Sequence, residues 1–206
     1  MALRRVLQIE QAADATVLRS KATRITSFDK SLQPLIDDMI ETMRETDGVG
    51  LAAPQVGVLR RIVVIEQPAQ FEEQEDGSVR EIAPPELVVM INPEIIKASE
   101  ETITMQEGCL SMPGRYGDVP RASWVTIKYQ DIHGKEQRIR HASSDGYKIG
   151  RIAQHEIDHL DGVMFTDRMA DITTLVDLRQ DPERPRRRRP LLRRRPEADV
   201  GNPAQE

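Results

Sequence analysis

The segment SSDGYKIGRIAQHEIDHLDG, residues 143–162, decides the fold, because it predicts the element around which the rest is arranged. Its apolar side chains recur every three or four residues, the period of one face of an α-helix. Ser144 or Asp145 can cap the start of this helix, and Gly162 can end it. The apolar positions are Ile149, Ile152, Ala153, Ile157 and Leu160. Predicted strands lie on both sides of the segment, so we expect the helix to be central.

Two histidines of this helix, His155 and His159, lie four residues apart and therefore one turn apart on the same face. Imidazoles at this spacing can bind one metal ion, and Glu156, rotated by about 100°, can reach a water molecule on that metal. The alternative is a pair of surface histidines on an amphipathic helix. The chain has only four histidines, and the glutamate directly after the first favours the metal site.

A catalytic metal site needs about three protein ligands, so a third must lie elsewhere. One zinc-protease pattern continues as H-x-x-G-x-x-H, but Phe165 occupies the place of its last histidine. Another uses a downstream glutamate, and the only ones are Glu183, Glu197 and Glu206 in a Pro/Arg-rich segment. Cys109 is the better candidate, because a thiolate is a strong donor to Zn²⁺ or Fe²⁺. A single cysteine is otherwise usually a small buried apolar residue.

The charge is unevenly distributed along the 206 residues. The formal net charge is −5, and residues 184–195, RPRRRRPLLRRR, carry eight arginines and no acid, which leaves −13 for the rest of the chain. We predict one domain over residues 1–175 and an Arg/Pro-rich, disordered tail over residues 176–206. The basic tail suggests contact with a polyanion such as ribosomal RNA; the alternative is a solvated tail without a partner.

The compartment is indicated by what the sequence lacks. One cysteine excludes an internal disulfide and fits a reducing compartment. The N-terminal residues have no apolar stretch of the kind found in secretory signals. No segment approaches the roughly 20 apolar residues of a membrane span. We expect a cytoplasmic protein with no membrane contact.

Short apolar runs rich in β-branched residues predict strands over residues 61–67 and 86–93. The polar stretch between them, residues 68–85, contains the turn pair Asp76-Gly77 and is expected to be an exposed excursion. Residues 124–140 alternate on both sides of His133-Gly134, which predicts a β-hairpin.

A second helix is predicted between Ser27 or Ser31 and Asp47-Gly48, with Leu35, Ile36, Met39, Ile40 and Met43 on its apolar face. We expect residues 1–27 to form an irregular arm. The fold class is therefore α+β, with a mainly antiparallel sheet.

Three stretches together resemble the peptide deformylase family: GVGLAAPQ (48–55), EGCLS (107–111) and QHEIDHLDG (154–162). Without the resemblance, the first stretch is a glycine turn after a helix, and it lacks the lysine of a phosphate-binding loop, so no nucleotide is implied. The similarity runs from about residue 3 to 170. It implies an α+β fold with antiparallel sheets around a central metal-binding helix, and a deformylase-like catalytic domain over residues 1–175.

The resemblance also implies roles for individual residues. Cys109, His155 and His159 match the family's metal ligands, and Glu156 matches its catalytic glutamate. Gln55 and the backbone N–H of Leu110 match the groups that stabilise the oxyanion. Substrate-binding positions are matched by Gly50, Val49, Glu107 and Tyr116. Glu107 is also expected to orient its neighbours, and Tyr116, with Arg115 before it, stands where several family members have an arginine.

The implied reaction removes the formyl group from the N-terminal methionine of newly synthesised polypeptides. A metal-bound water attacks the formyl carbon, with Glu156 as general base and then acid. The resemblance implies Fe²⁺, with Zn²⁺, Ni²⁺ or Co²⁺ able to replace it, and N-formylmethionyl nascent peptides as partners. The alternative is a non-catalytic, metal-containing module that binds RNA or the ribosome. Arg151 and Lys148 lie one and two turns before His155 on its face, and at the Lys148 position the resemblance implies an apolar residue near the methionine pocket.

Overall fold

The computed structural model describes residues 2–74, 77–143 and 149–180. Its largest unit is a five-stranded antiparallel sheet in the order β1-β2-β5-β8-β9. These strands are β1 (Gly50–Ala52), β2 (Ile62–Gln67), β5 (Glu86–Ala98), β8 (Trp124–Gln130) and β9 (Glu136–Ala142). A three-stranded antiparallel sheet has the order β10-β7-β6, from β6 (Thr102–Cys109), β7 (Met112–Ala122) and β10 (Val176–Asp177). The predicted α+β class with antiparallel sheets is confirmed.

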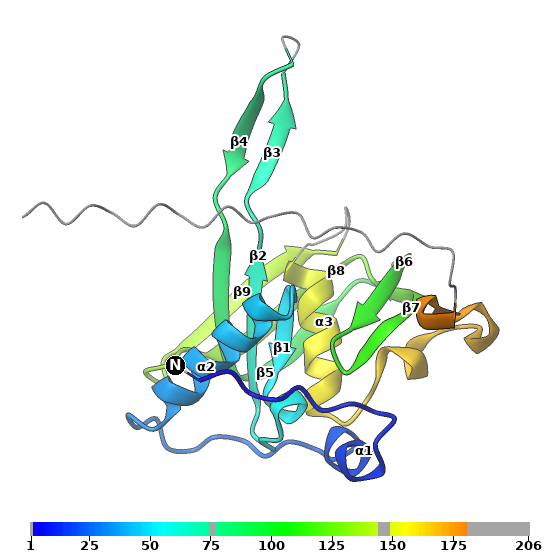
Figure 1. Cartoon of the computed structure of the whole chain (residues 1–206). Coiled ribbons are helices and arrows are strands. Elements are labelled where there is room, and N and C mark those ends of the chain that lie inside the picture. The colour runs from blue at the N-terminus through cyan, green and yellow to red at the C-terminus, as the bar shows by residue number, and fades with distance from the viewer. Residues whose placement is uncertain (1, 75–76, 144–148, 181–206) are drawn as a thin grey trace, which may run out of the picture.

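The predicted central helix is α3 (Ile149–Leu160), and Figure 1 shows it between the five-stranded sheet and the β6–β7 pair. All twelve of its residues are buried, the polar ones included. Its apolar side packs on the sheet in a core that includes Val63, Ile65 and Ile127. The two proposed capping residues, Ser144 and Asp145, lie outside the described residues. The helix stops before Gly162, whose φ of 73° is left-handed, as the sequence predicted.

Helix α2 (Leu32–Glu45) packs on the opposite face of the large sheet. Successive side chains of a strand point to opposite faces, so Ile62 and Val64 of β2 contact the α2 core while Val63 and Ile65 contact the α3 core. This explains why β2 is an uninterrupted β-branched run. Ser31 precedes α2 as predicted, although its side chain makes no capping hydrogen bond.

The predicted excursion and hairpin are both confirmed. Strands β3 (Gln70–Glu73) and β4 (Val79–Ala83) form a separate two-stranded sheet that projects from the body. Asp76 lies outside the described residues, while Gly77 has the left-handed φ of 78° that the turn requires. Strands β8 and β9 meet around Gly134, with φ 80°.

The N-terminal segment was predicted wrongly as an irregular arm, because it contains helix α1 (Ala12–Leu18). The sequence gives little sign of this helix, since it has seven residues and its N-cap residue, Gln11, makes no capping bond. Tertiary contacts stabilise it instead: Leu18 is fully buried, and the Asp14 carboxylate accepts two hydrogen bonds from Arg5 and one from the Gln8 N–H.

The chain remains folded slightly beyond the boundary expected at residue 175. Val176 and Asp177 of β10 pair with Tyr116 and Arg115 of β7. Short 3-10 helices complete the fold: η1 (Ala53–Val56), η2 (Phe165–Arg168), η3 (Ile172–Thr174) and η4 (Leu178–Gln180). The Arg/Pro-rich tail from residue 181 lies outside the described residues. Within the described ranges, no helix is long and apolar enough to span a membrane.

Gly162→Ala is expected to destabilise the fold more than a glycine substitution elsewhere with the same backbone conformation. The left-handed conformation costs alanine about 1–2 kcal/mol, and the new Cβ would also meet the backbone carbonyl of Arg19, which adds about 1–3 kcal/mol of overpacking. Gly57 is the matched control, because its φ is 81° but no atom lies within 4 Å of an added Cβ. Urea unfolding of both variants measures the difference. Equal losses of unfolding free energy would show that the contact with Arg19 contributes nothing.

Candidate metal centre

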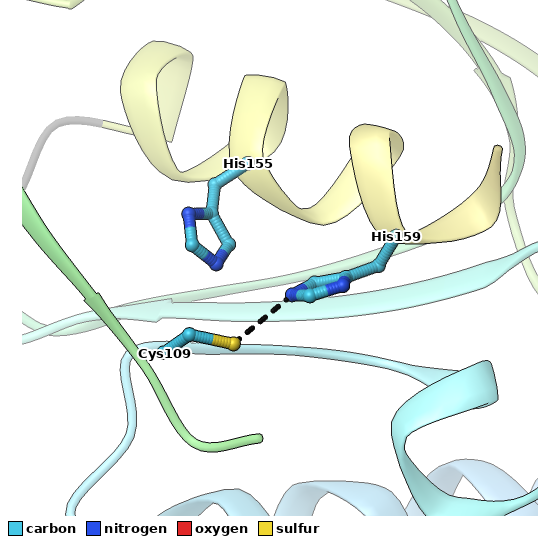
Figure 2. A group of neighbouring side chains, drawn as sticks. All are labelled: Cys109, His155 and His159. Atoms are coloured by element: carbon cyan, nitrogen blue, oxygen red, sulfur yellow. Dashed lines mark hydrogen bonds between the residues drawn. The ribbon is translucent and has the colours of Figure 1, made fainter. Parts of the chain in front are cut away.

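The structure brings the three predicted metal ligands together from two elements. Cys109 is the last residue of β6, and His155 and His159 project from α3 towards it (Figure 2). One donor atom from each residue lies within 4.8 Å of the others, and Cys109 Sγ is 3.2 Å from His159 Nε2. The two imidazole rings meet edge to face, with centroids 5.0 Å apart. Helical spacing places the two histidines together, and the packing of β6 against α3 brings Cys109 to them.

These residues fit a divalent cation. Thiolate and imidazole suit Zn²⁺ and Fe²⁺, and three protein donors leave a position open for water or substrate. Burial holds the pKa of His159 well below the usual range, which keeps that ring neutral and able to bind metal. At His155, Cys109 and Glu107 outweigh burial and raise the pKa. The anionic groups around His155 therefore favour positive charge at that position.

Glu107 contacts the ring nitrogen of His155 that does not face the other two ligands (Figure 2). Its Oε2 lies 2.9 Å from His155 Nδ1, so a proton on Nδ1 leaves the Nε2 lone pair free for a metal. Burial alone would raise the pKa of Glu107, but hydrogen bonds from His155 and Arg121 lower it to about 2. Its carboxylate contacts these side chains and Arg151. Glu107 also lines the cavity described below, but its carboxylate is engaged by these three side chains.

Glu156 is the residue of the site with an uncommitted carboxylate. It is buried, and its Oε2 has no hydrogen-bond partner among the described residues. Burial raises its pKa to about 7, the range in which a general acid/base works best near neutral pH. A Cβ added at Gly50 would lie 2.5 Å from Glu156 Oε1, so the carboxylate lies directly against the backbone of β1.

Gln55 lies on η1, and its side chain approaches Cys109. Its Oε1 accepts a hydrogen bond from the Ala52 N–H at 2.8 Å, which fixes the orientation of the amide. Its Nε2 then faces Ser111 Oγ at 3.3 Å and Cys109 Sγ at 3.5 Å. A fixed N–H donor thus points at the metal-binding cluster, where it can stabilise a developing negative charge.

A cavity of about 650 Å³ opens beside these groups. Val49, Gly50, Leu110 and Tyr116 line it, and Tyr116 is 36% exposed. Arg115 also lines the cavity, but its guanidinium forms ion pairs with Glu10 and Asp177.

The structure describes two of three further residues that the sequence singled out: Arg151 and Phe165, but not Lys148. The guanidinium of Arg151 donates to backbone carbonyls of Ile103, Met105 and Val119, so its charge is satisfied by the β6–β7 pair. Lys148 lies outside the described residues. Phe165, in the place of a ligand histidine, is buried with its ring 6.2 Å from that of His155.

Two buried charged residues, Arg121 and Asp158, were not predicted from the sequence; they form an ion pair, and Arg121 also pairs with Glu107. A weak signal was present, because Gly117, Val119 and Arg121 alternate along β7 and the first two are small or apolar. Because Arg121 points to the same face of β7 as these two residues, it is a candidate for burial.

An antiparallel α+β fold around a helix that presents two histidines to a cysteine, with a buried glutamate beside them, defines a metal-dependent hydrolase. The family model described as Polypeptide deformylase matches residues 6–174. The chain therefore belongs to the polypeptide deformylase family, as its motifs indicated.

Similar proteins cover nearly the whole domain. The peptide deformylase of Chloroflexus aurantiacus is 48% identical over 88% of this chain and 95% of its own. That of Roseiflexus sp. (strain RS-1) is 49% identical over 88% and 96%. The crystal structure of the Thermotoga maritima peptide deformylase has a TM-score of 0.67 and 35% identity over 83% of this chain and 100% of its own. A Met-Ala-Ser-bound peptide deformylase from Acinetobacter baumannii has a TM-score of 0.66 and 32% identity over 82% and 99%.

Proposed function

We propose that this chain performs the reaction of its family, removal of the formyl group from N-formylmethionyl polypeptides, with Glu156 as the general base and acid. The observation that supports this most is the buried, uncommitted Glu156 carboxylate beside the Cys109, His155 and His159 cluster. Deformylation needs a nucleophile, a stabilised oxyanion and a proton for the leaving amine. The site offers a group for each.

We infer that Cys109, His155 and His159 hold the cation, and that it is Fe²⁺ in the cell, with Zn²⁺, Ni²⁺ or Co²⁺ able to replace it. When bound, the cation would act as a Lewis acid and lower the pKa of a water molecule. The mixed sulfur and nitrogen donor set is compatible with each of these metals.

Glu156 takes the proton from the attacking water and delivers it to the amine nitrogen as the C–N bond breaks. Formate and a free N-terminal amine are the products. The Gln55 amide and the Leu110 N–H donate to the oxygen of the tetrahedral intermediate. The hydrogen bond from Ala52 holds the Gln55 amide before substrate arrives, so little reorganisation is needed during the reaction.

The cavity is the proposed peptide site. Val49 lines the space for the methionine side chain, the main chain of Gly50 hydrogen-bonds the peptide, and Tyr116 contacts it at the rim. The Acinetobacter relative was solved with Met-Ala-Ser bound, which is the deformylated form of such a substrate. Glu107 contributes indirectly through His155.

We further propose that the enzyme works in the cytoplasm on nascent chains, and that the arginines of residues 184–195 contact ribosomal RNA. Phosphate contacts of this kind weaken steeply as salt rises. Removing residues 181–206 should therefore weaken ribosome binding at low salt without changing the hydrolysis of a free tripeptide.

The direct test is formate release from a formyl-Met-Ala-Ser peptide by protein purified without oxygen and loaded with Fe²⁺. Turnover that disappears with a chelator and returns on adding metal is the expected result. An acetyl-Met-Ala-Ser peptide serves as the control substrate. If the folded, metal-loaded protein releases no formate, the proposal fails and the non-catalytic RNA-binding alternative becomes the better explanation.

Gly50→Ala is expected to lower kcat/KM by about 10²-fold, because misplacing a catalytic group by about 1 Å costs that much. The added methyl would lie 2.5 Å from Glu156 Oε1 and 2.7 Å from Ile152 Cγ2, so the carboxylate must move. Gly77→Ala in the β3–β4 hairpin is the control, since nothing lies within 4 Å of its Cβ. Steady-state formate release compares the two, and an active Gly50→Ala variant would mean that the Glu156 position is not critical.

A further inference from the structure

The proposed metal ligands come from a strand and a helix. Cys109 lies on β6, and His155 and His159 lie on α3. A metal site requires the separation of these elements to be fixed to within a fraction of an ångström. Backbone hydrogen bonds within a sheet do not fix the separation between the strand β6 and the helix α3. Four buried charged residues occupy the boundary between β6, β7 and α3, and we call them the charge cluster: Glu107, Arg121, Arg151 and Asp158.

Arg121 is the member of the charge cluster that joins a carboxylate on β6 to a carboxylate on α3. It extends from β7 and is 5% exposed. Its Nε and Nη2 each lie 3.0 Å from one oxygen of Glu107 on β6. Its Nη1 donates to Asp158 on α3 at 2.5 Å. A planar guanidinium with two such contacts fixes both the position and the plane of a carboxylate.

The Glu107 carboxylate in turn contacts the ligand His155 at Nδ1. Arg121 is therefore separated from the metal ligand by a single side chain. Arg151 cannot take over this role, because its terminal nitrogens donate to backbone carbonyls of β6 and β7. It joins Glu107 only through Nε, at 3.0 Å.

We propose that Arg121 is a positioning residue for the metal centre, acting through Glu107 on His155 and through Asp158 on α3. This inference rests on the proposed ligands Cys109, His155 and His159. It assigns a function to a residue outside the three motifs, which contacts neither the substrate cavity nor the ligands themselves.

The test measures metal affinity rather than turnover. Co²⁺ is titrated into the metal-free protein without oxygen, in competition with a chelator, and the visible absorption of the bound ion is followed. Arg121→Lys keeps the charge but loses the planar two-point contact with Glu107. Removing an outer partner of a metal-binding histidine typically costs about 10–100-fold in metal affinity, and we expect a rise of that size in the dissociation constant, with altered Co²⁺ bands.

Arg168→Gln is the matched control, because Arg168 contacts Asp158 but not Glu107 and its side chain is 51% exposed. It should leave the dissociation constant essentially unchanged. Glu107→Gln completes a double-mutant cycle. If Arg121 acts mainly through Glu107, the double variant should bind Co²⁺ little more weakly than Glu107→Gln alone.

The possible failures are distinguishable. A wild-type protein that does not bind Co²⁺ would contradict the proposed ligands and this inference together. Wild-type affinity in a folded Arg121→Lys variant would overturn this inference alone, as would fully additive effects in the cycle. If Arg121→Lys does not fold, Asp158→Asn decides, because it removes the second anchor of Arg121 and leaves the Glu107 contact: weaker Co²⁺ binding supports the inference and unchanged binding overturns it.

Discussion

Glu156→Gln is expected to lower kcat for formate release by about 10²- to 10⁴-fold, the usual contribution of a general acid/base. Glutamine has nearly the same shape, so it should lie against Gly50 as the native side chain does, but it can neither take nor return a proton. Glu156 is not among the three clustered donors. The variant should therefore retain its metal while losing turnover.

The measurement is kcat at saturating formyl-Met peptide, with the metal content of each preparation determined in parallel. Glu41→Gln is the matched control, because Glu41, on α2 and outside the cavity, also has a buried oxygen without a hydrogen-bond partner among the described residues. It should remain fully active. A metal-loaded Glu156→Gln variant that loses less than about tenfold, or 1.4 kcal/mol of barrier, would refute the role of Glu156.

Local patterns in the sequence predicted the helix that carries His155 and His159, but not the elements β1, η1 and β6 that carry Gly50, Gln55 and Cys109. The spacing of His155 and His159 follows directly from helical geometry, and the alternation in residues 124–140 follows from strand geometry. Cys109 was favoured because two downstream ligand patterns failed and because a thiolate is a strong donor to Zn²⁺ or Fe²⁺. The convergence of these residues in space is the observation that the structure adds.

Features that depend on distant partners could not be predicted in this way. Helix α1 has no capping signal, and its stability comes from burial of Leu18 and from the Asp14–Arg5 pair. The burial of Arg121 depends on two carboxylates far away in sequence, Glu107 and Asp158. β10 consists of two residues and forms only because β7 presents an edge. No local period encodes such pairings.

Gln55→Leu is expected to lower kcat by about 10²- to 10³-fold, as removal of a side-chain oxyanion donor typically does. The amide is held by the Ala52 N–H, and its Nε2 points towards Cys109 Sγ. It therefore donates where charge develops in the transition state, and KM should change much less than kcat. Leucine also leaves the Ala52 N–H without its partner, which costs about 1–3 kcal/mol of unfolding free energy, so chemical denaturation must show that the variant remains folded.

Ser111→Ala is the control for Gln55→Leu, because the Ser111 hydroxyl contacts the same Nε2 at 3.3 Å without being a proposed oxyanion donor. It frees the Gln55 amide from a competing acceptor and should keep kcat close to the wild-type value. If Ser111→Ala were as inactive as Gln55→Leu, the two residues would act together in holding Cys109. A folded, metal-loaded Gln55→Leu variant with near wild-type kcat would leave the Leu110 N–H as the remaining proposed oxyanion donor.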